Sequence, residues 1–126
     1  MDKVNLAYYS ITGQTKRFVD KLGIDGYEIT DADPFYQMGR SFILIVPSYD
    51  DDMMDPVIDF LQYEDNAKNC VGVAGGGNRN FNTLYNHTAK DIAAALNVPV
   101  VFEFEFNGTT KDVENFKKVV NEIGIK

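Results

Sequence analysis

The chain has 126 residues and a single cysteine, and 44% of its residues are hydrophobic and 25% charged. This size and composition predict one folded domain over residues 1–126 and exclude a disordered or disulfide-stapled chain. No apolar run approaches the roughly 20 residues of a membrane helix. We therefore expect a protein of the reducing cytoplasm that does not enter a membrane.

The net charge of −7 is unevenly distributed along the chain. Residues 25–65 hold eleven acids against one base, Arg40. Such a field disfavours nucleic acid and anionic membranes as partners, and it suits docking onto a basic patch of another protein. At this stage the same acids could equally serve solubility alone.

The N-terminal half alternates strand and helix patterns. Residues 4–9 predict a strand, and residues 14–22 predict a helix that ends at a glycine. Residues 27–30 predict a short strand, whereas 31–40 is too short to predict a helix. Residues 41–47 form the continuous apolar run expected of a central parallel strand covered on both faces. The side chains that we expect to face inward from the first helix are Phe18, Val19 and Leu22.

The C-terminal half continues the alternation. Residues 55–63 predict a helix that starts with an Asp-Pro pair, Asp55 as N-cap, and residues 71–75 predict a fourth strand. Residues 84–96 predict a helix, and 100–106 an edge strand in which glutamates alternate with phenylalanines. Thr109 is expected to cap a last helix. The inward-facing residues predicted for these helices are Val57, Phe60, Leu61, Leu84, Thr88, Ile92, Ala95, Val113, Phe116, Val120 and Ile123.

This order of elements predicts an α/β fold, with a parallel sheet covered by helices on both faces and connected by right-handed crossovers. In such sheets ligands bind at the carboxyl ends of the strands, where the strand order reverses. The loops after the first, third and fourth strands are therefore the places to look for a site.

The loop after the first strand reads YSITGQTK, Tyr9 to Lys16. Ser10, Thr12 and Thr15 offer hydroxyls, Gly13 permits a tight turn, and a helix begins at once. Backbone N–H groups at a helix start bind anions, so the loop suits a phosphate held without a lysine clamp; it is not a Walker A loop. A simple helix cap is the alternative, but three hydroxyls around one glycine favour the phosphate.

The loop after the fourth strand reads GGGNRNF, Gly75 to Phe81. Its glycines allow close approach by a flat ligand, and its asparagines and phenylalanine offer amides and an aromatic face. A flexible connection explains the same residues equally well. The residues that would meet a ligand here are Gly76, Gly77, Asn78, Asn80 and Phe81.

The loop after the third strand reads PSYDDDMMDP, Pro47 to Pro56. Ser48 and Tyr49 directly follow the strand, and Tyr49 could stack on a planar ring. Three consecutive carboxylates cannot all reach one ion without distorting the backbone, so a metal site is the interpretation that we favour least. A loop that suits a phosphate, opposite an aromatic residue and a run of glycines, indicates a site for a flat cofactor that carries a phosphate. Flavin mononucleotide (FMN) is the simplest cofactor with both properties.

Through S-x-T-G-Q-T after its first strand the chain resembles the flavodoxin-like superfamily, and more closely it resembles the NrdI family. The specific similarity lies in YYSITGQTKRFVDKL, in IVPSY followed by VIDFL, in GNRNF and in NVPVVFEFEFNGTTKDVENFKKVV. The resemblance implies a three-layer flavodoxin-like sandwich with strand order 2-1-3-4-5. It also implies a small flavoprotein that serves class Ib ribonucleotide reductase.

The resemblance further implies how the cofactor is held and used. Reduced flavin would react with molecular oxygen, and superoxide would pass to the reductase's small, radical-bearing subunit, which holds a dimanganese site in most members. An unidentified protein partner would reduce the flavin, and no side chain would act as acid, base or nucleophile. The implied FMN contacts are Ser10, Thr12, Gly13, Gln14 and Thr15 for the phosphate, and Ser48, Tyr49, Asp50, Asp51, Gly76, Gly77, Asn78, Asn80 and Phe81 for the ring.

Two departures from the family pattern stand out. Gln14 occupies a position where flavodoxin-type loops usually have asparagine, and Asp50 to Asp52 replace a loop that is usually glycine-rich. Negative charge near the ring disfavours the anionic, fully reduced flavin, so we expect a low second reduction potential. Two other functions stay open from the residues: a general flavodoxin that carries single electrons, and a non-redox module that binds a phosphate-bearing ligand.

Overall fold

The computed structural model describes residues 5–11, 13–23, 26–30, 32–47, 55–77, 87–105 and 108–123. Within these residues five parallel strands form one sheet in the order β2-β1-β3-β4-β5. This confirms the predicted α/β fold and its strand order. The elements are β1 (Asn5–Tyr9), α1 (Gln14–Leu22), β2 (Gly26–Ile29), β3 (Phe42–Pro47), α2 (Asp55–Gln62), α3 (Asn66–Asn69), β4 (Cys70–Gly77), α4 (His87–Leu96), β5 (Val100–Glu105) and α5 (Thr110–Ile123).

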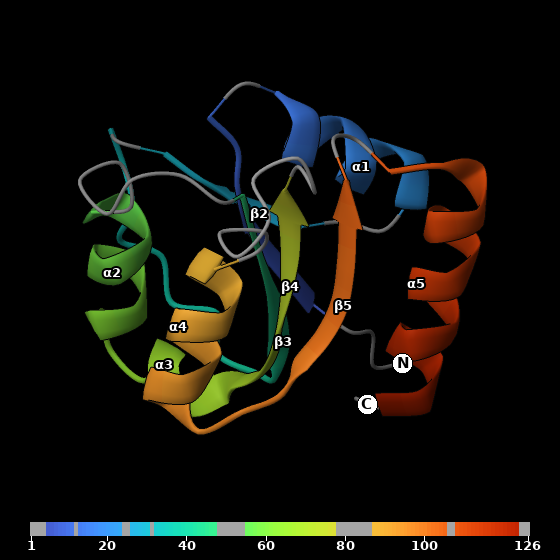
Figure 1. Ribbon diagram of the computed structural model, residues 1–126. Helices are drawn as coiled ribbons and strands as arrows, with labels where there is room; N and C mark the ends of the chain where they lie inside the picture. Colours follow the sequence, from blue (N-terminus) through green and yellow to red (C-terminus); the bar gives the residue numbers. More distant parts are fainter. Residues whose placement is uncertain are drawn as a thin grey trace.

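The sheet lies between two layers of helices (Figure 1). Helices α2, α3 and α4 cover one face, and α1 and α5 cover the other. The central strand β3 is buried along its whole length, which is why its sequence is apolar without alternation. Its successive side chains enter opposite layers: Phe42 and Leu44 pack toward α2 and α4, whereas Ile43 and Ile45 pack toward α1 and α5.

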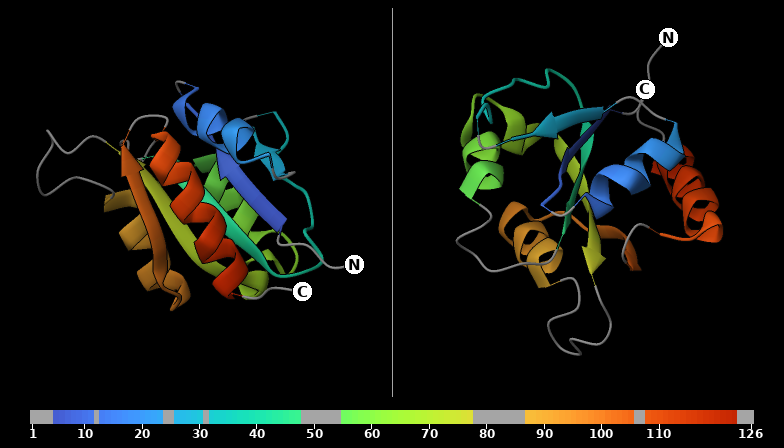
Figure 2. Two further views of the ribbon diagram at one scale, coloured as in Figure 1. Left: turned by 90° about the vertical axis from the view of Figure 1, so that its right-hand side faces the viewer. Right: turned by 90° about the horizontal axis from the view of Figure 1, so that it is seen from above.

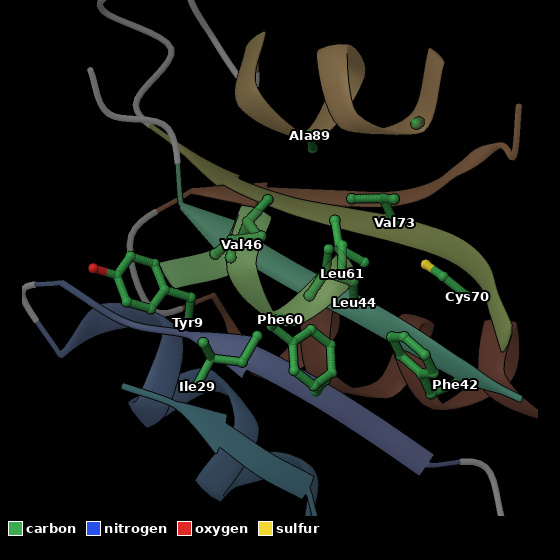
Figure 3. Packing of buried hydrophobic residues seen from close by; sticks show 13 residues of the cluster. Tyr9, Ile29, Phe42, Leu44, Val46, Phe60, Leu61, Cys70, Val73 and Ala89 are labelled. Atoms are coloured by element: carbon green, nitrogen blue, oxygen red, sulfur yellow. The ribbon is translucent and has the colours of Figure 1, made fainter. Parts of the chain in front are cut away.

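The layer under α2 and α4 packs aromatic and aliphatic side chains of these helices against those of four strands (Figure 3). The Phe60 ring of α2 meets the Phe42 ring of β3 edge-on, with centroids 5.7 Å apart, and lies beside Ile29 of β2. The sulfur of Cys70 lies in the same cluster, where its thiol donates to the carbonyl of Gly72 at 3.4 Å. Sheet and helix α2 are thus held together by apolar burial.

The other layer is built on a stack of phenylalanines. The ring of Phe18 from α1 stacks on Phe104 of β5 with centroids 4.0 Å apart, and it meets Phe116 of α5 at 5.6 Å. Helix α5 begins with a reciprocal cap, in which Thr109 Oγ1 accepts from the Asp112 N–H and an Asp112 carboxylate oxygen accepts from the Thr109 N–H, both at 3.0 Å. The predicted cap at Thr109 is confirmed.

Most predicted elements are confirmed within one or two residues, but the short helix α3 was not predicted and the buried face of α4 differs from the expected one. Ala95 was expected on the inner face of α4, but it is exposed; the helix instead buries Thr88, Ala89 and Ala93. The wrong stripe came from spacing residues strictly by three and four, whereas a helix lying flat on a sheet also buries adjacent pairs. Residues 32–41 form no helix, as their length suggested.

The buried thiol gives a test of this packing. Burial raises the pKa of Cys70 to about 11, from 9.0 for an ordinary thiol, so less than about one per cent is thiolate at pH 8. We expect iodoacetamide to modify the native protein at least tenfold more slowly than the urea-unfolded chain at pH 8. Because the folded pKa is the higher one, stability should fall as the pH rises from 9 through 11, and Cys70→Ala should remove this loss. Equal alkylation rates in the two states would contradict the burial.

Candidate functional site

The strands β1, β3 and β4 are neighbours in the sheet and end at the same edge (Figure 2). Strand β1 ends at Tyr9, β3 at Pro47 and β4 at Gly77, and Pro47 is registered with Gly76. The sheet order reverses between β1 and β3, since β2 lies on one side of β1 and all later strands lie on the other. The three predicted loops therefore start side by side at the switch point, where α/β sheets bind ligands.

The first loop is fixed against the start of α1. Ser10 Oγ accepts a hydrogen bond from the Lys16 backbone N–H at 3.2 Å, and Gly13 takes a left-handed conformation with φ of 92°. That angle favours glycine, so the tight turn predicted at Gly13 is confirmed. Thr15 is only 2% exposed, which makes it part of the covered wall of the loop rather than its rim. The arrangement directs the amino end of α1 toward the switch point.

Two basic residues follow the loop, and they have different surroundings. Arg17 Nη1 donates to Gln14 Oε1 at 3.3 Å, and its guanidinium lies 3.9 Å from where a Cβ on Gly13 would stand. Lys16 instead extends to β2, where its Nζ lies 3.7 Å from a Glu28 carboxylate oxygen. Arg17 is therefore the cation that lies against the loop.

Sequence reasoning stopped at Thr15 and so missed Arg17. The signal that could have found it is its position three residues after Gln14, which places both side chains on one side of the first turn of α1. The charged end of the Lys16 side chain interacts with Tyr8 as well as with Glu28. Burial raises the pKa of the Tyr8 phenol, and Glu28 raises it further, while Tyr8 and Glu28 raise the pKa of Lys16.

Gly76 was predicted as a place of close ligand approach, and the structure gives it a packing role as well. A Cβ at this position would stand 2.9 Å from Cε2 of Phe104, the strand neighbour on β5. Position 76 thus has no room for a side chain, because the Phe104 ring fills that space. Gly77, the last residue of the strand, pairs with Glu105.

The remaining predicted contacts lie outside the described residues: Thr12, Ser48, Tyr49, Asp50, Asp51, Asn78, Asn80 and Phe81. In the described part of the chain no group of three His, Cys, Asp or Glu side chains is placed to hold a metal ion. None of the helices described there is long and apolar enough to cross a membrane.

Comparison with known proteins identifies the family. The sequence model described as "NrdI Flavodoxin like" matches residues 6–118. The chain belongs to the NrdI family. It is 41% identical to Protein NrdI of Bartonella quintana over 88% of each chain, and 37% identical to Protein NrdI of Escherichia coli over 93% of this chain and 91% of that one.

Solved structures agree with this assignment at the level of the fold. A short-chain flavodoxin associated with a bacterial microcompartment superposes with a TM-score of 0.68, covering 98% of this chain and 99% of its own, at 20% identity. The family and the flavodoxin-like fold together imply a flavin cofactor and an association with ribonucleotide reductase.

The contact between Gly76 and Phe104 can be tested by enlarging the side chain at position 76 and shrinking the one at position 104. Gly76→Ala should lower the free energy of unfolding by about 1–3 kcal/mol, because the new methyl group overlaps the ring. In the background of Phe104→Leu the same substitution should cost less than half as much, since the smaller side chain leaves room. Urea unfolding of the two single variants and the double variant measures the coupling; additive effects would contradict the contact.

Proposed function

We propose that this protein binds FMN non-covalently and, in its reduced state, supplies superoxide for assembly of the radical cofactor in the small subunit of a class Ib ribonucleotide reductase. The observation that carries the proposal is the position of the amino end of α1, which directly follows β1 at the switch point of the sheet in a chain of the NrdI family; such a helix start favours a bound phosphate. The cofactor supplies the single-electron transfer to oxygen.

The part of the protein itself would be to bind the cofactor and to orient it. The phosphate would be held by Ser10, Thr12, Gly13, Gln14 and Thr15, and we add the Arg17 guanidinium to this set. A phosphate monoester carries close to two negative charges at neutral pH. The positive end of the α1 dipole and one nearby guanidinium would stabilise this phosphate, and no lysine of the Walker A type would be needed.

The ring would lie between the loops that follow β3 and β4. The residues proposed to contact it are Ser48, Tyr49, Asp50, Asp51, Gly76, Gly77, Asn78, Asn80 and Phe81. None of them is required to transfer a proton or form a covalent bond. Their tasks are to stack on the ring, to meet its polar edge with amides and to set the electrostatic potential around it.

The role of Arg17 is tested by comparing FMN with riboflavin, which lacks the phosphate. Arg17→Met should weaken FMN binding about tenfold, because a charge-assisted hydrogen bond contributes roughly 1.5 kcal/mol or more. It should leave riboflavin affinity unchanged. Lys16→Met is the matched control, since Lys16 extends to Glu28, and it should change FMN affinity less than twofold. Equal losses for FMN and riboflavin would assign Arg17 a merely structural role.

The biological role is tested with the small subunit of a class Ib reductase from the same organism, loaded with Mn(II). Adding the photoreduced, FMN-loaded protein and oxygen should generate the subunit's radical, seen by electron paramagnetic resonance. Superoxide dismutase present in solution distinguishes direct delivery from free diffusion. Absence of the radical, with fast electron transfer to a one-electron acceptor such as cytochrome c, would favour a general electron carrier instead.

The aspartates of the third loop give a prediction on redox potential. Asp50→Gly should raise the potential of the couple that produces the fully reduced flavin, because it removes a negative charge next to an anionic product. Asp59→Asn removes one charge from the exposed face of α2 and serves as the control. Potentiometric titration of both variants measures the two shifts in potential. Identical shifts would show that the effect comes from the net charge of the protein and not from the position of Asp50.

A further inference from the structure

Two large aromatic side chains are exposed on the segment that connects β2 to β3. Phe35 is 55% exposed and Tyr36 is 49% exposed. The Tyr36 ring stacks on Tyr27 of β2 with centroids 4.4 Å apart, and the Phe35 ring lies 5.6 Å from that of Tyr63, which follows α2. These four residues, Tyr27, Phe35, Tyr36 and Tyr63, are called the aromatic ridge below.

The ridge is held in place although its segment has no regular secondary structure. Asn66, which is fully buried, accepts from the Met38 N–H at 2.9 Å and donates to the carbonyls of Tyr36 and Phe60, both at 2.8 Å. One side chain thereby connects the exposed segment to the end of α2. A buried amide with its hydrogen bonds satisfied is costly to disturb, so the aromatic rings are presented on a fixed backbone.

A second set of contacts fixes the borders of the same segment. Tyr27 Oη donates to the Asp33 carbonyl at 2.5 Å, and Gln37 Nε2 donates to Asp65 Oδ1 at 3.2 Å. Rigid aromatic side chains lose little conformational entropy on binding, and such residues contribute most of the energy at protein interfaces. The ridge differs from isolated aromatic residues on a protein surface because its exposed rings are carried by a backbone that hydrogen bonds hold in place.

Acidic side chains border the ridge. Asp33, Glu64 and Asp65 are exposed and adjoin it. The backbone carbonyl of Asp33 accepts from Tyr27; burial raises the pKa of that phenol, and the charge of Asp33 raises it further. The Asp65 carboxylate accepts from Gln37, and Glu64 is the chain neighbour of Tyr63. Over residues 32–47 and 55–69 five acids stand against two bases. The surface therefore pairs apolar rings with negative charge.

Charge decides which kind of partner fits. A second copy of this chain would bring acids opposite acids, and nucleic acid or an anionic membrane would be repelled. A protein surface with an apolar pocket bordered by lysine and arginine would gain both the buried rings and the opposite charge. The complementary charge also speeds association and makes it depend on salt.

We propose that the aromatic ridge is a docking surface for the ribonucleotide reductase small subunit, which meets it with an apolar pocket bordered by basic residues. The inference rests on the proposed function for the identity of this partner. The ridge is built from β2, the segment after it and the end of α2, whereas the proposed cofactor loops follow β1, β3 and β4. It would hold the partner through residues that do not themselves carry the flavin.

The test is a binding measurement between the FMN-loaded protein and the isolated small subunit, by calorimetry at low ionic strength. Phe35→Ser combined with Tyr36→Ser should raise the Kd at least tenfold. The matched control is Ile58→Ser, since Ile58 is 44% exposed on α2 and is no part of the ridge, and it should change the Kd less than twofold. Asp33→Asn with Glu64→Gln should flatten the salt dependence, whereas Asp20→Asn on α1 should not.

The outcomes separate the two proposals. If the wild-type protein binds the small subunit and the double variant binds equally well, the docking surface is overturned and the proposed function stands. If the wild-type protein shows no binding, both are overturned. A wild-type dimer in sedimentation that the double variant dissociates would assign the ridge to a second copy instead. Should the double variant melt below the control, Phe35→Ser alone is used, because the Phe35 ring packs on the ring of Tyr63, which is itself partly exposed. This single variant should still raise the Kd at least threefold.

Discussion

The complete burial of β3 is the constraint on which the rest of the molecule depends. Its residues from Phe42 to Val46 are fully covered, and alternate side chains enter opposite layers. Two helix layers are needed to keep water from both faces, and a neighbouring strand is needed on each side to pair its backbone; both neighbours, β1 and β4, are parallel to it. Once β1 and β4 take these places, the carboxyl ends of three strands meet, and the loops that follow them share one site.

The same packing explains why β4 has a glycine at position 76, near its carboxyl end. The Phe104 ring occupies the space that a side chain at Gly76 would need, and it stacks on Phe18 at the core of the opposite layer. The turn at Gly13 likewise depends on the absence of a side chain. Core packing at Gly76 and turn geometry at Gly13 thus each require glycine at positions that are also proposed to contact the cofactor.

Charge is distributed over the molecule in a way that separates two tasks. Arg17 lies at the loop proposed for the phosphate, whereas the acids that adjoin the aromatic ridge surround the segment after β2. The cation at the loop proposed for the phosphate and the acids at the proposed docking surface are carried by different elements.

Local patterns in the sequence determined the order and type of the elements. The continuous apolar run at Phe42 to Pro47, the helical spacing of Phe18 and Leu22, and the glycine between hydroxyl residues at Gly13 each predicted what the structure contains. These signals suffice because periodicity and turn chemistry act between residues close in sequence. Family motifs added the strand order and the expected cofactor, and the order is confirmed.

Only the tertiary structure decided which side chains meet across long separations. Asn66 bonds to residues 28 and 30 positions earlier, and nothing in its local sequence distinguishes it from an ordinary helix-start asparagine. The aromatic ridge exists only because that amide fixes a segment without periodicity beside Tyr27 and Tyr63. Ala95 was misplaced for the same reason, since the packing of α4 on the sheet decides which of its residues are buried. Contacts of this kind depend on the packing of whole layers, which a linear pattern does not contain.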